Sequence, residues 1–495
     1  MKQKKLIIIG AGISGLVAGV YAQRSGFDVT ILEQHRIPGG LSTSWSRKGY
    51  FFEGGMHWLT GSAPSFPLYA VWKETGALQK NNPIYNRDPV YTLFDGTVRL
   101  SLYRDLARFK QELLRVAPED KKAIFRLCRD IKLFTKVHVI ISDIAFLKTA
   151  QPVHPALSEL LGMVPAGFRY MRLKAQTMQS YVEAFKNENI RALLLSLIGS
   201  RYNALSLVYS ISSFLSGDCG FPEGGSMRMA QNLADTFTAL GGTIRYGTQV
   251  QRIQIENRTV CGVVTTAGSI ATDNVLVAFD TRTAIEGQLL PALKERWVHD
   301  MRRFVVTEQN MFFCLGVTAD LSAYPETMMV PLKQPLAVGG EQFSILRINN
   351  YAAKKGYAPE GCSTVTCILM APCYQFWKNL KTNGTYQSEK QNAIAKFIQT
   401  LETVIPEIRG NVAVTDLATP CTYERYTSSY EGSWMSVWVP GGAYWKFPVK
   451  SKTVRGLYFA SERTLMPGGL PMCAQAGRMA AQTICRDNHA TFIRA

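Results

Sequence analysis

The chain has 495 residues, 46% of them hydrophobic, and carries a formal net charge of +18. This length supports a well-buried core and favours two interleaved domains. The positive charge suits nucleic acid, anionic lipid or an acidic substrate, but the sequence has no long Lys/Arg tract and no zinc-finger spacing, so we expect no nucleic-acid partner.

The ten cysteines are scattered and form no CxxC pair, and the nearest cluster, Cys362, Cys367 and Cys373, has no histidine beside it. This pattern predicts no metal site and indicates the reduced thiols of a cytoplasmic protein. The first apolar run leads into a glycine turn without a small-residue cleavage site, and no apolar run reaches membrane-spanning length. We therefore expect neither a signal peptide nor a transmembrane segment.

Residues 4–35 predict a strand, a turn, a helix and a second strand, around the sequence LIIIGAGISGLVAGVYA. In a dinucleotide-binding turn, Gly10 gives the tight bend, Gly12 lets the backbone approach a diphosphate, and Gly15 allows close packing of helix on strand. The phosphates then lie at the helix amino terminus, beside Ile13 and Ser14, where free N–H groups and the helix dipole favour negative charge.

An acidic residue follows at the expected place. Glu33 ends the second strand, next to Gln34, where its carboxylate can accept hydrogen bonds from ribose hydroxyls and disfavours a 2′-phosphate. A second glycine pair, Gly39 and Gly40, comes too early for another strand–helix unit, and glycine lets the backbone come close to a ligand. A nucleotide longer than the adenosine half of NAD explains the pair, and FAD fits. No second glycine fingerprint indicates a separate NAD(P)H-binding domain.

The remaining chain is expected to be mainly helical over residues 102–216, to form a helix, a strand and hairpins over 220–279, and to alternate strands with a few helices over 300–450. The end of the chain, residues 456–487, predicts a strand, a loop and a helix. No internal repeat or low-complexity linker divides these regions.

The run ILEQHRIPGGLSTSWSRKGYFFEGGMHWLTG, residues 31–61, resembles the FAD-dependent amine-oxidase-like superfamily, and most closely its branch of phytoene desaturases, carotenoid isomerases and retinol saturases. Three further blocks are similar to that branch: FPEGGSMRMAQNLADTFTALGGTIRYGTQVQRI (221–253), DNVLVAFDT (273–281) and GLYFASERTLMPGGLPMCAQAGRMAA (456–481). Two positions depart from the pattern. Leu41 stands where many relatives have arginine, with Arg36 and Arg47 nearby, and Ser461–Glu462 replaces the usual Gly-Asp or Gly-Glu.

The resemblance implies an α/β fold in which a Rossmann-type FAD-binding domain is interleaved with a mixed β-sheet substrate domain and a helical cap. The implied divisions are 1–100 with 220–300 and 450–490 for FAD, 101–219 for the cap, and 301–449 for the substrate. The implied cofactor-binding residues are Gly10, Gly12, Ile13, Ser14, Gly15, Glu33, Gln34, Gly39, Gly40, Leu41, Gly55, Met56, His57, Val250, Ser461, Glu462, Gly469, Leu470, Pro471 and Met472. Among them, Val250 would pack on the adenine through its backbone.

The last block places glycines and prolines before a helix expected to begin near residue 472, with its amino terminus aimed at the N1–C2=O edge of a flavin. Gly54 to His57 form the expected second wall. Three residues are candidates for a role near the flavin or substrate: His57, Tyr430 and Trp434. Each is also compatible with a plain structural role, His57 as a hydrogen-bonded core histidine and the two aromatic residues as ordinary core.

We therefore expect a flavin-dependent oxidoreductase that acts on carbon–carbon bonds of an apolar polyene or isoprenoid lipid, as a desaturase or saturase. The alternatives are a reduced-flavin cis–trans isomerase of the same lipids, an amine-oxidase-like enzyme on soluble amines, and a non-catalytic lipid carrier stabilised by flavin. Residues 121–148 and 168–176 mix basic and apolar side chains at helical spacing. They predict contact with an anionic membrane, at its inner face, or else a solvated cationic face over ordinary core helices. The electron partner is not identified by the sequence.

Overall fold

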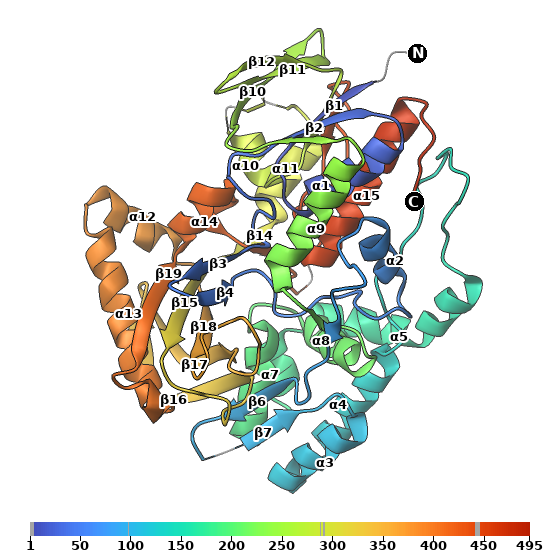
Figure 1. Ribbon diagram of the computed structural model, residues 1–495. Helices are drawn as coiled ribbons and strands as arrows, with labels where there is room; N and C mark the ends of the chain where they lie inside the picture. Colours follow the sequence, from blue (N-terminus) through green and yellow to red (C-terminus); the bar gives the residue numbers. More distant parts are fainter. Residues whose placement is uncertain (1–3, 98, 288, 291–292, 441–445) are drawn as a thin grey trace.

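The computed structural model describes residues 4–97, 99–287, 289–290, 293–440 and 446–495 (Figure 1). Its first layer is a parallel sheet of five strands drawn from distant parts of the chain. The strand order is β21 (Leu457–Phe459), β13 (Asn274–Val277), β1 (Lys5–Ile9), β2 (Asp28–Leu32) and β9 (Thr243–Arg245). β1 is almost entirely apolar because both faces of a parallel sheet are covered.

Three helices cover one face of this sheet and pack against one another (Figure 1). They are α1 (Ile13–Arg24), α9 (Gly225–Ala239) and α15 (Gly469–Asp487). The other face is covered by a three-stranded antiparallel sheet and two short helices. These are β10 (Val250–Glu256), β11 (Thr259–Thr265), β12 (Gly268–Ala271), α10 (Thr281–Glu286) and α11 (Arg296–Phe304).

A second large sheet has seven strands, in the order β19-β15-β18-β17-β16-β6-β7. Their bounds are Val412–Ala418, Asn310–Val317, Ser363–Met370, Glu341–Asn350, Thr327–Val338, Tyr91–Phe94 and Arg99–Leu102. α12 (Tyr374–Thr382) and α13 (Tyr386–Glu402) pack on one face through apolar side chains. On the other face lies the hairpin of β3 (Ser44–Arg47) and β4 (Tyr50–Glu53). Since β6 and β7 belong to this sheet, the expected division at residue 100 does not coincide with a boundary between the sheets.

The region expected to be helical forms a bundle with its own apolar core. Its helices are α3 (Leu106–Val116), α4 (Lys121–Phe134), α5 (Leu157–Ala175), α6 (Met178–Val182), α7 (Glu188–Ile198) and α8 (Ala204–Leu215). The predicted helix over 121–148 is wrong beyond Phe134, because residues 135–156 run as an irregular connection. Shorter elements complete the chain: α2 (Pro67–Glu74), β5 (Ile84–Tyr85), η1 (Pro118–Asp120), β8 (Phe221–Pro222), β14 (Val306–Glu308), η2 (Pro406–Ile408), α14 (Pro420–Thr427), η3 (Tyr430–Gly432) and β20 (Met435–Val437).

Across the residues that the structure describes, no helix combines the length and the apolar character needed to cross a bilayer. The two main sheets meet where the carboxyl ends of the parallel strands face the second sheet. Ligands of open α/β sheets bind at this edge, and a large cavity opens there.

Candidate functional site

A cavity of about 1470 Å³, measured out to its mouth, lies between the two sheets. Ile9 and Leu32, the last residues of β1 and β2, line it on one side, and Asn310 and Ile368 of β15 and β18 line it on the other. This volume includes space that is open to solvent at the mouth. The cavity lies at the edge of the parallel sheet where ligands of open α/β sheets bind.

The first glycine turn forms one end of the cavity. Gly10 has a φ of +105°, and its N–H donates to the carbonyl of Leu32 at 2.8 Å. A Cβ atom at Gly15 would stand 2.1 Å from the carbonyl oxygen of Gly10, so only glycine lets α1 cross β1 this closely. At Gly12, by contrast, a Cβ would have its nearest protein atom at 4.0 Å. Gly12 therefore keeps space free toward the cavity, where the first N–H groups of α1 are exposed to a ligand.

The second glycine pair packs directly on the first turn. The N–H of Gly39 donates to the carbonyl of Ala11 at 2.8 Å, and Gly39 pairs with Gly12 as an isolated parallel bridge. Gly40 has a φ of +60°, and a Cβ built on it would lie 3.5 Å from the Cα atom of Gly12. The two glycine segments thus form one continuous wall of backbone, as a ligand that runs along both would require.

Glu33 lies beside this wall and is 6% exposed. Its Oε2 accepts a hydrogen bond from the N–H of Ala11 at 2.7 Å, and its Oε1 accepts one from the N–H of His35 at 2.8 Å. Burial raises the pKa of Glu33, and these N–H donors oppose that rise. A carboxylate has about four lone-pair sites, so the two bonds fix its orientation and leave acceptor capacity for a ligand. Val250 and Thr248 line the cavity next to it, and the Thr248 N–H donates to the Glu33 carbonyl at 2.8 Å.

The end of the chain reaches the same cavity, because Ser461, Glu462, Gly469 and Leu470 line it. The predicted start of the last helix near residue 472 is wrong. α15 begins at Gly469, since Gly468 and Gly469 adopt φ values of +86° and +80° that turn the chain into the helix. Pro471 falls in the first helical turn, where its missing N–H costs no hydrogen bond.

Glu462 is held close to the start of α15. Its Oε2 accepts hydrogen bonds from the N–H and the hydroxyl of Ser436, both at 3.2 Å. A Cβ at Gly468 would stand 2.6 Å from the same oxygen. Burial raises the pKa of Glu462 to about 7, against the opposing charge of Arg463, whose Nε lies 2.6 Å from the Glu462 Oε1.

A buried ion pair that the sequence analysis missed joins the two ends of the site. The guanidinium of Arg463 is fully buried, with its Nη2 3.0 Å from Oδ2 of Asp280, which lies three residues after the end of β13 and lines the cavity. Asp280 also caps α10 by accepting from the N–H of Arg282 at 2.8 Å, and it accepts from the N–H of Tyr430 at 2.8 Å. An acid shortly after a predicted parallel strand is a signal that the block DNVLVAFDT contains.

No lysine or arginine is among the described residues that line the cavity. Leu41 lines it where many relatives place arginine, whereas Arg47 lies 3.7 Å from Asp416 and is exposed. Negative charge on a ligand must therefore be met by backbone N–H groups and helix amino termini. These suffice in many phosphate sites.

The opposite end of the cavity is apolar and aromatic. The rings of His57 and Trp434 lie 6.2 Å apart and perpendicular, with Ile368 and Met435 in the same wall. Burial, and then the charges of Arg347 and Arg87, lower the pKa of His57 well below its usual value, so its imidazole is neutral. The surroundings of this end favour an uncharged, apolar ligand.

Several residues that line the cavity have a buried polar atom without a hydrogen-bond partner in the protein. They are Ser42 Oγ, His57 Nδ1, Asn310 Nδ2, Ser429 Oγ and Trp434 Nε1. Buried polar groups are nearly always paired, so their clustering here indicates a ligand that brings its own polar atoms. Together with the glycine wall, which any side chain would fill, this set fits a flavin dinucleotide.

Most of the predicted site residues meet in this cavity. Those lining it are Gly10, Gly12, Ile13, Ser14, Glu33, Gln34, Gly39, Gly40, Leu41, Gly55, His57, Val250, Trp434, Ser461, Glu462, Gly469 and Leu470. Gly15, Met56, Pro471 and Met472 lie behind the lining, and Tyr430 lies outside it, with the guanidinium carbon of Arg282 4.5 Å from its ring centroid.

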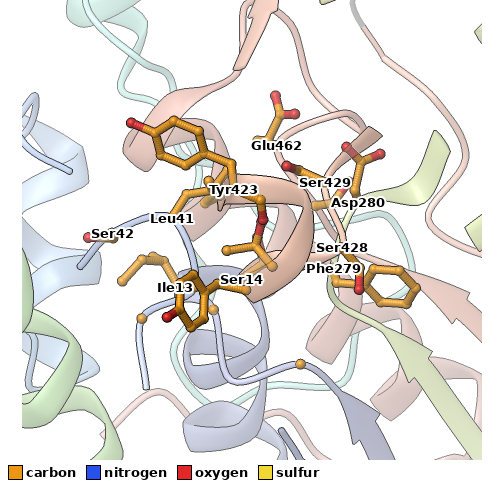
Figure 2. Close-up of a pocket in the computed structure, with 18 of the residues that line it drawn as sticks. Ile13, Ser14, Leu41, Ser42, Phe279, Asp280, Tyr423, Ser428, Ser429 and Glu462 are labelled. Atoms are coloured by element: carbon orange, nitrogen blue, oxygen red, sulfur yellow. The ribbon is translucent and has the colours of Figure 1, made fainter. Parts of the chain in front are cut away.

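The sequence analysis also missed other lining residues, partly drawn in Figure 2: Ser42, Thr248, Gln249, Phe279, Asp280, Asn310, Ile368, Tyr423, Tyr426, Ser428, Ser429, Met435 and Cys473. In Figure 2, Ile13 and Ser14 of the first turn share the site with Asp280 and Glu462. The described residues contain no group of three or more His, Cys, Asp or Glu side chains that could hold a metal ion.

Comparison with known proteins agrees with this geometry. The family model described as flavin containing amine oxidoreductase matches residues 13–485. The chain is 24% identical over 479 residues to all-trans-retinol 13,14-reductase of Danio rerio, which covers 86% of this chain and 76% of that protein. It is 22% identical over 513 residues to phytoene desaturase (lycopene-forming) of a Paracoccus species, with 98% of both chains covered.

Among solved structures, an oxidoreductase from Methanosarcina mazei is similar with a TM-score of 0.61 and 18% identity, covering 96% of this chain and 99% of that one. This likeness supports the α/β fold. The family match begins at residue 13, just after Gly10 and Gly12. It includes Gly39 and Gly40 and the terminal block that lines the cavity.

Proposed function

Because the chain belongs to the family of flavin-containing amine oxidoreductases, it is a flavin-dependent oxidoreductase, and we propose that its flavin is FAD and its substrate an apolar polyene or isoprenoid lipid. One observation carries the proposal: the glycine turn at the start of the chain and the glycine-rich helix start at its end line one cavity. That cavity has acids at its nucleotide end and an apolar wall at the other.

The diphosphate of the proposed FAD lies against Gly10, Gly12 and the amino terminus of α1. Gly12 leaves this space open, since its Cβ position has no protein atom nearer than 4.0 Å. The N–H groups of the first turn of α1 donate to the phosphate oxygens, and the helix dipole adds about 0.3–1 kcal/mol of stabilisation. The absence of basic side chains among the described lining residues makes these backbone groups the principal anion site.

Glu33 accepts hydrogen bonds from the ribose hydroxyls, oriented by the N–H groups of Ala11 and His35. Its negative charge repels a 2′-phosphate, which favours FAD over a phosphorylated nucleotide. Val250, adjacent to Thr248 at the same end of the cavity, packs on the adenine through its backbone. Asp280 and Glu462 lie farther along and accept from hydroxyls of the chain that links phosphate to ring.

When bound, the flavin accepts or donates a hydride at N5. The amino terminus of α15, with Gly469 and Leu470 in the lining, stabilises negative charge on the N1–C2=O edge of the reduced ring. His57 stays neutral, so the described residues that line the apolar end present no charged side chain to the cavity. Ile368, Met435 and Trp434 hold an apolar substrate and exclude water from it.

The names of the two relatives, a retinol reductase and a phytoene desaturase, support carbon–carbon bonds of a polyene as the reacting bonds. We propose that the five-stranded sheet, its helices and the terminal block bind FAD, that residues 301–449 bind the substrate, and that residues 101–219 form a cap. An anionic membrane surface is the proposed source of the lipid. The electron partner has no assigned surface.

The test is anaerobic incubation of FAD-loaded protein with all-trans-retinol and with phytoene in detergent, followed by absorbance of the flavin. We expect the oxidised protein to lose its flavin absorbance with a substrate that it desaturates, such as phytoene, or the reduced protein to regain it with a polyene that it saturates, such as all-trans-retinol. Putrescine is the control and is expected to change neither. A change in flavin absorbance with putrescine alone would contradict the lipid substrate. Cis–trans isomerisation of the polyene without a net change in the oxidation state of the flavin would show an isomerase instead of an oxidoreductase.

A further inference from the structure

The outward face of α5 is apolar along its whole length. Its exposed side chains include Leu157, Leu160, Leu161, Val164, Phe168 and Met171, which recur every three or four residues. Phe168 is 94% exposed and Leu157 72%. A Cβ atom at Gly167 would meet no atom within 4 Å, so nothing in the described chain covers this face. Figure 1 shows α5 at the right-hand edge of the view.

The helix itself is firmly attached through its other face. Ala166 and Leu173 are buried in the core of the helical bundle. Arg169 forms two hydrogen bonds with Asp130 of α4, at 2.8 and 2.5 Å, and the Asp130 carboxylate also accepts from the hydroxyl of Tyr181. The second half of α5, which carries Phe168 and Met171, is therefore anchored to the bundle while its outer face stays exposed.

A second exposed aromatic residue lies on the connection that leads into α5. Phe146 is 95% exposed and has a φ of +59°, a conformation that bulky residues rarely adopt. Hydrogen bonds between Asp143 and Val153, at 2.8 and 2.6 Å, close the loop that carries it. In Figure 1 this connection runs along the same edge of the molecule as α5.

The exposed charges of the segment that carries the stripe, residues 132–175, are basic. Lys132, Lys136, Lys148 and Arg172 are exposed. Over residues 132–175 the sequence has two acidic residues, and both are engaged: Asp143 with Arg478 at 2.6 Å and Glu159 with His138 at 2.7 Å. An apolar stripe with basic flanks matches the interior and the anionic headgroups of a bilayer. A second copy of this chain would instead bring like charges together, in a protein with a net charge of +18.

We propose that the stripe of α5, with Phe146, inserts into the headgroup region of an anionic membrane. Both segments predicted to contact a membrane contribute to this surface, 121–148 through Phe146 and 168–176 through Phe168 and Met171, whereas the apolar face of α4 (Lys121–Phe134) is packed in the core. The inner side of α5 packs next to a strand that reaches the cavity. The Tyr170 ring lies 6.2 Å from that of Trp438, which follows β20, and β20 begins at Met435 in the cavity wall. Delivery of a lipid substrate from this side rests on the proposed function, whereas membrane docking does not.

The experiment is co-sedimentation of the FAD-loaded protein with vesicles of phosphatidylcholine, alone or mixed with phosphatidylglycerol. We expect binding to the mixed vesicles, part of which persists in high salt because apolar insertion is not screened. The double variant Leu161→Asp/Phe168→Asp should lower the bound fraction about tenfold or more. Leu240→Asp, which changes an exposed leucine at the end of α9, is the matched control and should bind as the unaltered protein does.

Three outcomes would overturn the proposal. In the first, the protein sediments with neither kind of vesicle. In the second, the double variant sediments with the vesicles as the unaltered protein does. In the third, analytical ultracentrifugation shows that the unaltered protein is a dimer and the double variant a monomer. Phe168→Ser serves in the same assays if the double variant does not fold, with circular dichroism and flavin content as the checks. Failure of the lipid reaction in detergent, with vesicle binding intact, would count against the proposed function alone.

Discussion

Gly477 of α15 lies directly over Ser14 of α1, so that a Cβ atom built on Gly477 would stand 2.4 Å from the Ser14 carbonyl oxygen. The two helices begin at opposite ends of the sequence, and both have amino-terminal residues in the lining of the same cavity. This close crossing therefore sets the distance between the glycine turn that would hold a diphosphate and the helix start that would face the ring.

We predict that Gly477→Ala disrupts this crossing. The added methyl group meets backbone, which cannot move aside as a flexible side chain would, so the free energy of unfolding should fall by about 1–3 kcal/mol. Denaturant unfolding and flavin content measure the effect. Gly167→Ala, in a helix of the same length but facing open space, is the control and should be neutral or stabilising by up to about 1 kcal/mol. Equal stability of the two variants would contradict the crossing.

Two substitutions in the first glycine turn should affect different properties, one the stability of the fold and the other the binding of FAD. Gly15→Ala places a Cβ 2.1 Å from the Gly10 carbonyl oxygen and should destabilise the fold. Gly12→Ala meets protein atoms only at 4.0 Å, so the melting temperature without flavin should be close to that of the unaltered protein. FAD retention should nevertheless fall sharply, because the methyl group occupies the space we assign to the diphosphate. Full flavin occupancy in Gly12→Ala would show that the phosphates lie elsewhere.

Glu33→Ala should weaken FAD binding by about tenfold to a hundredfold, as expected for hydrogen bonds to a charged group worth about 1.5–3 kcal/mol. Glu33→Gln should have a smaller effect because its amide oxygen still accepts hydrogen bonds. Titration of the flavin-free protein with FAD, followed by fluorescence, measures both. Glu256→Ala, at an exposed acid of the neighbouring strand β10, is the control. An unchanged affinity in Glu33→Ala would remove the ribose contact.

Glu308 gives a prediction for pH. Burial raises the pKa of this carboxyl group, which lies 3.1 Å from Arg201, from 4.5 to about 7. The folded state therefore holds a proton that the unfolded state loses, and stability from this group falls as pH rises from 4.5 to about 7. Glu308→Gln should remove that fall, so the variant gains stability relative to the unaltered protein between about pH 5 and pH 8. The free energy of unfolding in urea, measured for both proteins at about pH 5 and pH 8, tests this. A difference in stability between the two proteins that is the same at both pH values would contradict the raised pKa of Glu308.

Local signals in the sequence predicted the nucleotide end of the site. The strand, turn and helix around Gly10, the acid at Glu33 and the second glycine pair each follow from neighbours in the chain, and the structure places all of them in the cavity. The predicted start of α15 lies too late because glycine and proline residues favour a loop in a sequence prediction. Two successive positive φ values at Gly468 and Gly469 bring the chain into the helix earlier.

Features that depend on contacts between distant parts of the chain could not be predicted from local sequence patterns. Asp280 and Arg463 are 183 residues apart, and only the adjacency of β13 and β21 brings them together. Tyr430 and Trp434 come from one aromatic stretch, yet only Trp434 lines the cavity. In α5, apolar residues occur on both faces, and periodicity alone does not tell which face the rest of the chain covers.

The account depends most directly on FAD bound by both ends of one chain, and the direct test is the absorbance spectrum of the purified protein with identification of the nucleotide released on denaturation. We predict the two bands of an oxidised flavin, release of FAD at about one per chain, and loss of both in Gly12→Ala while that variant remains folded. A folded protein that stays colourless after incubation with FAD, or that releases a different nucleotide, would contradict the account.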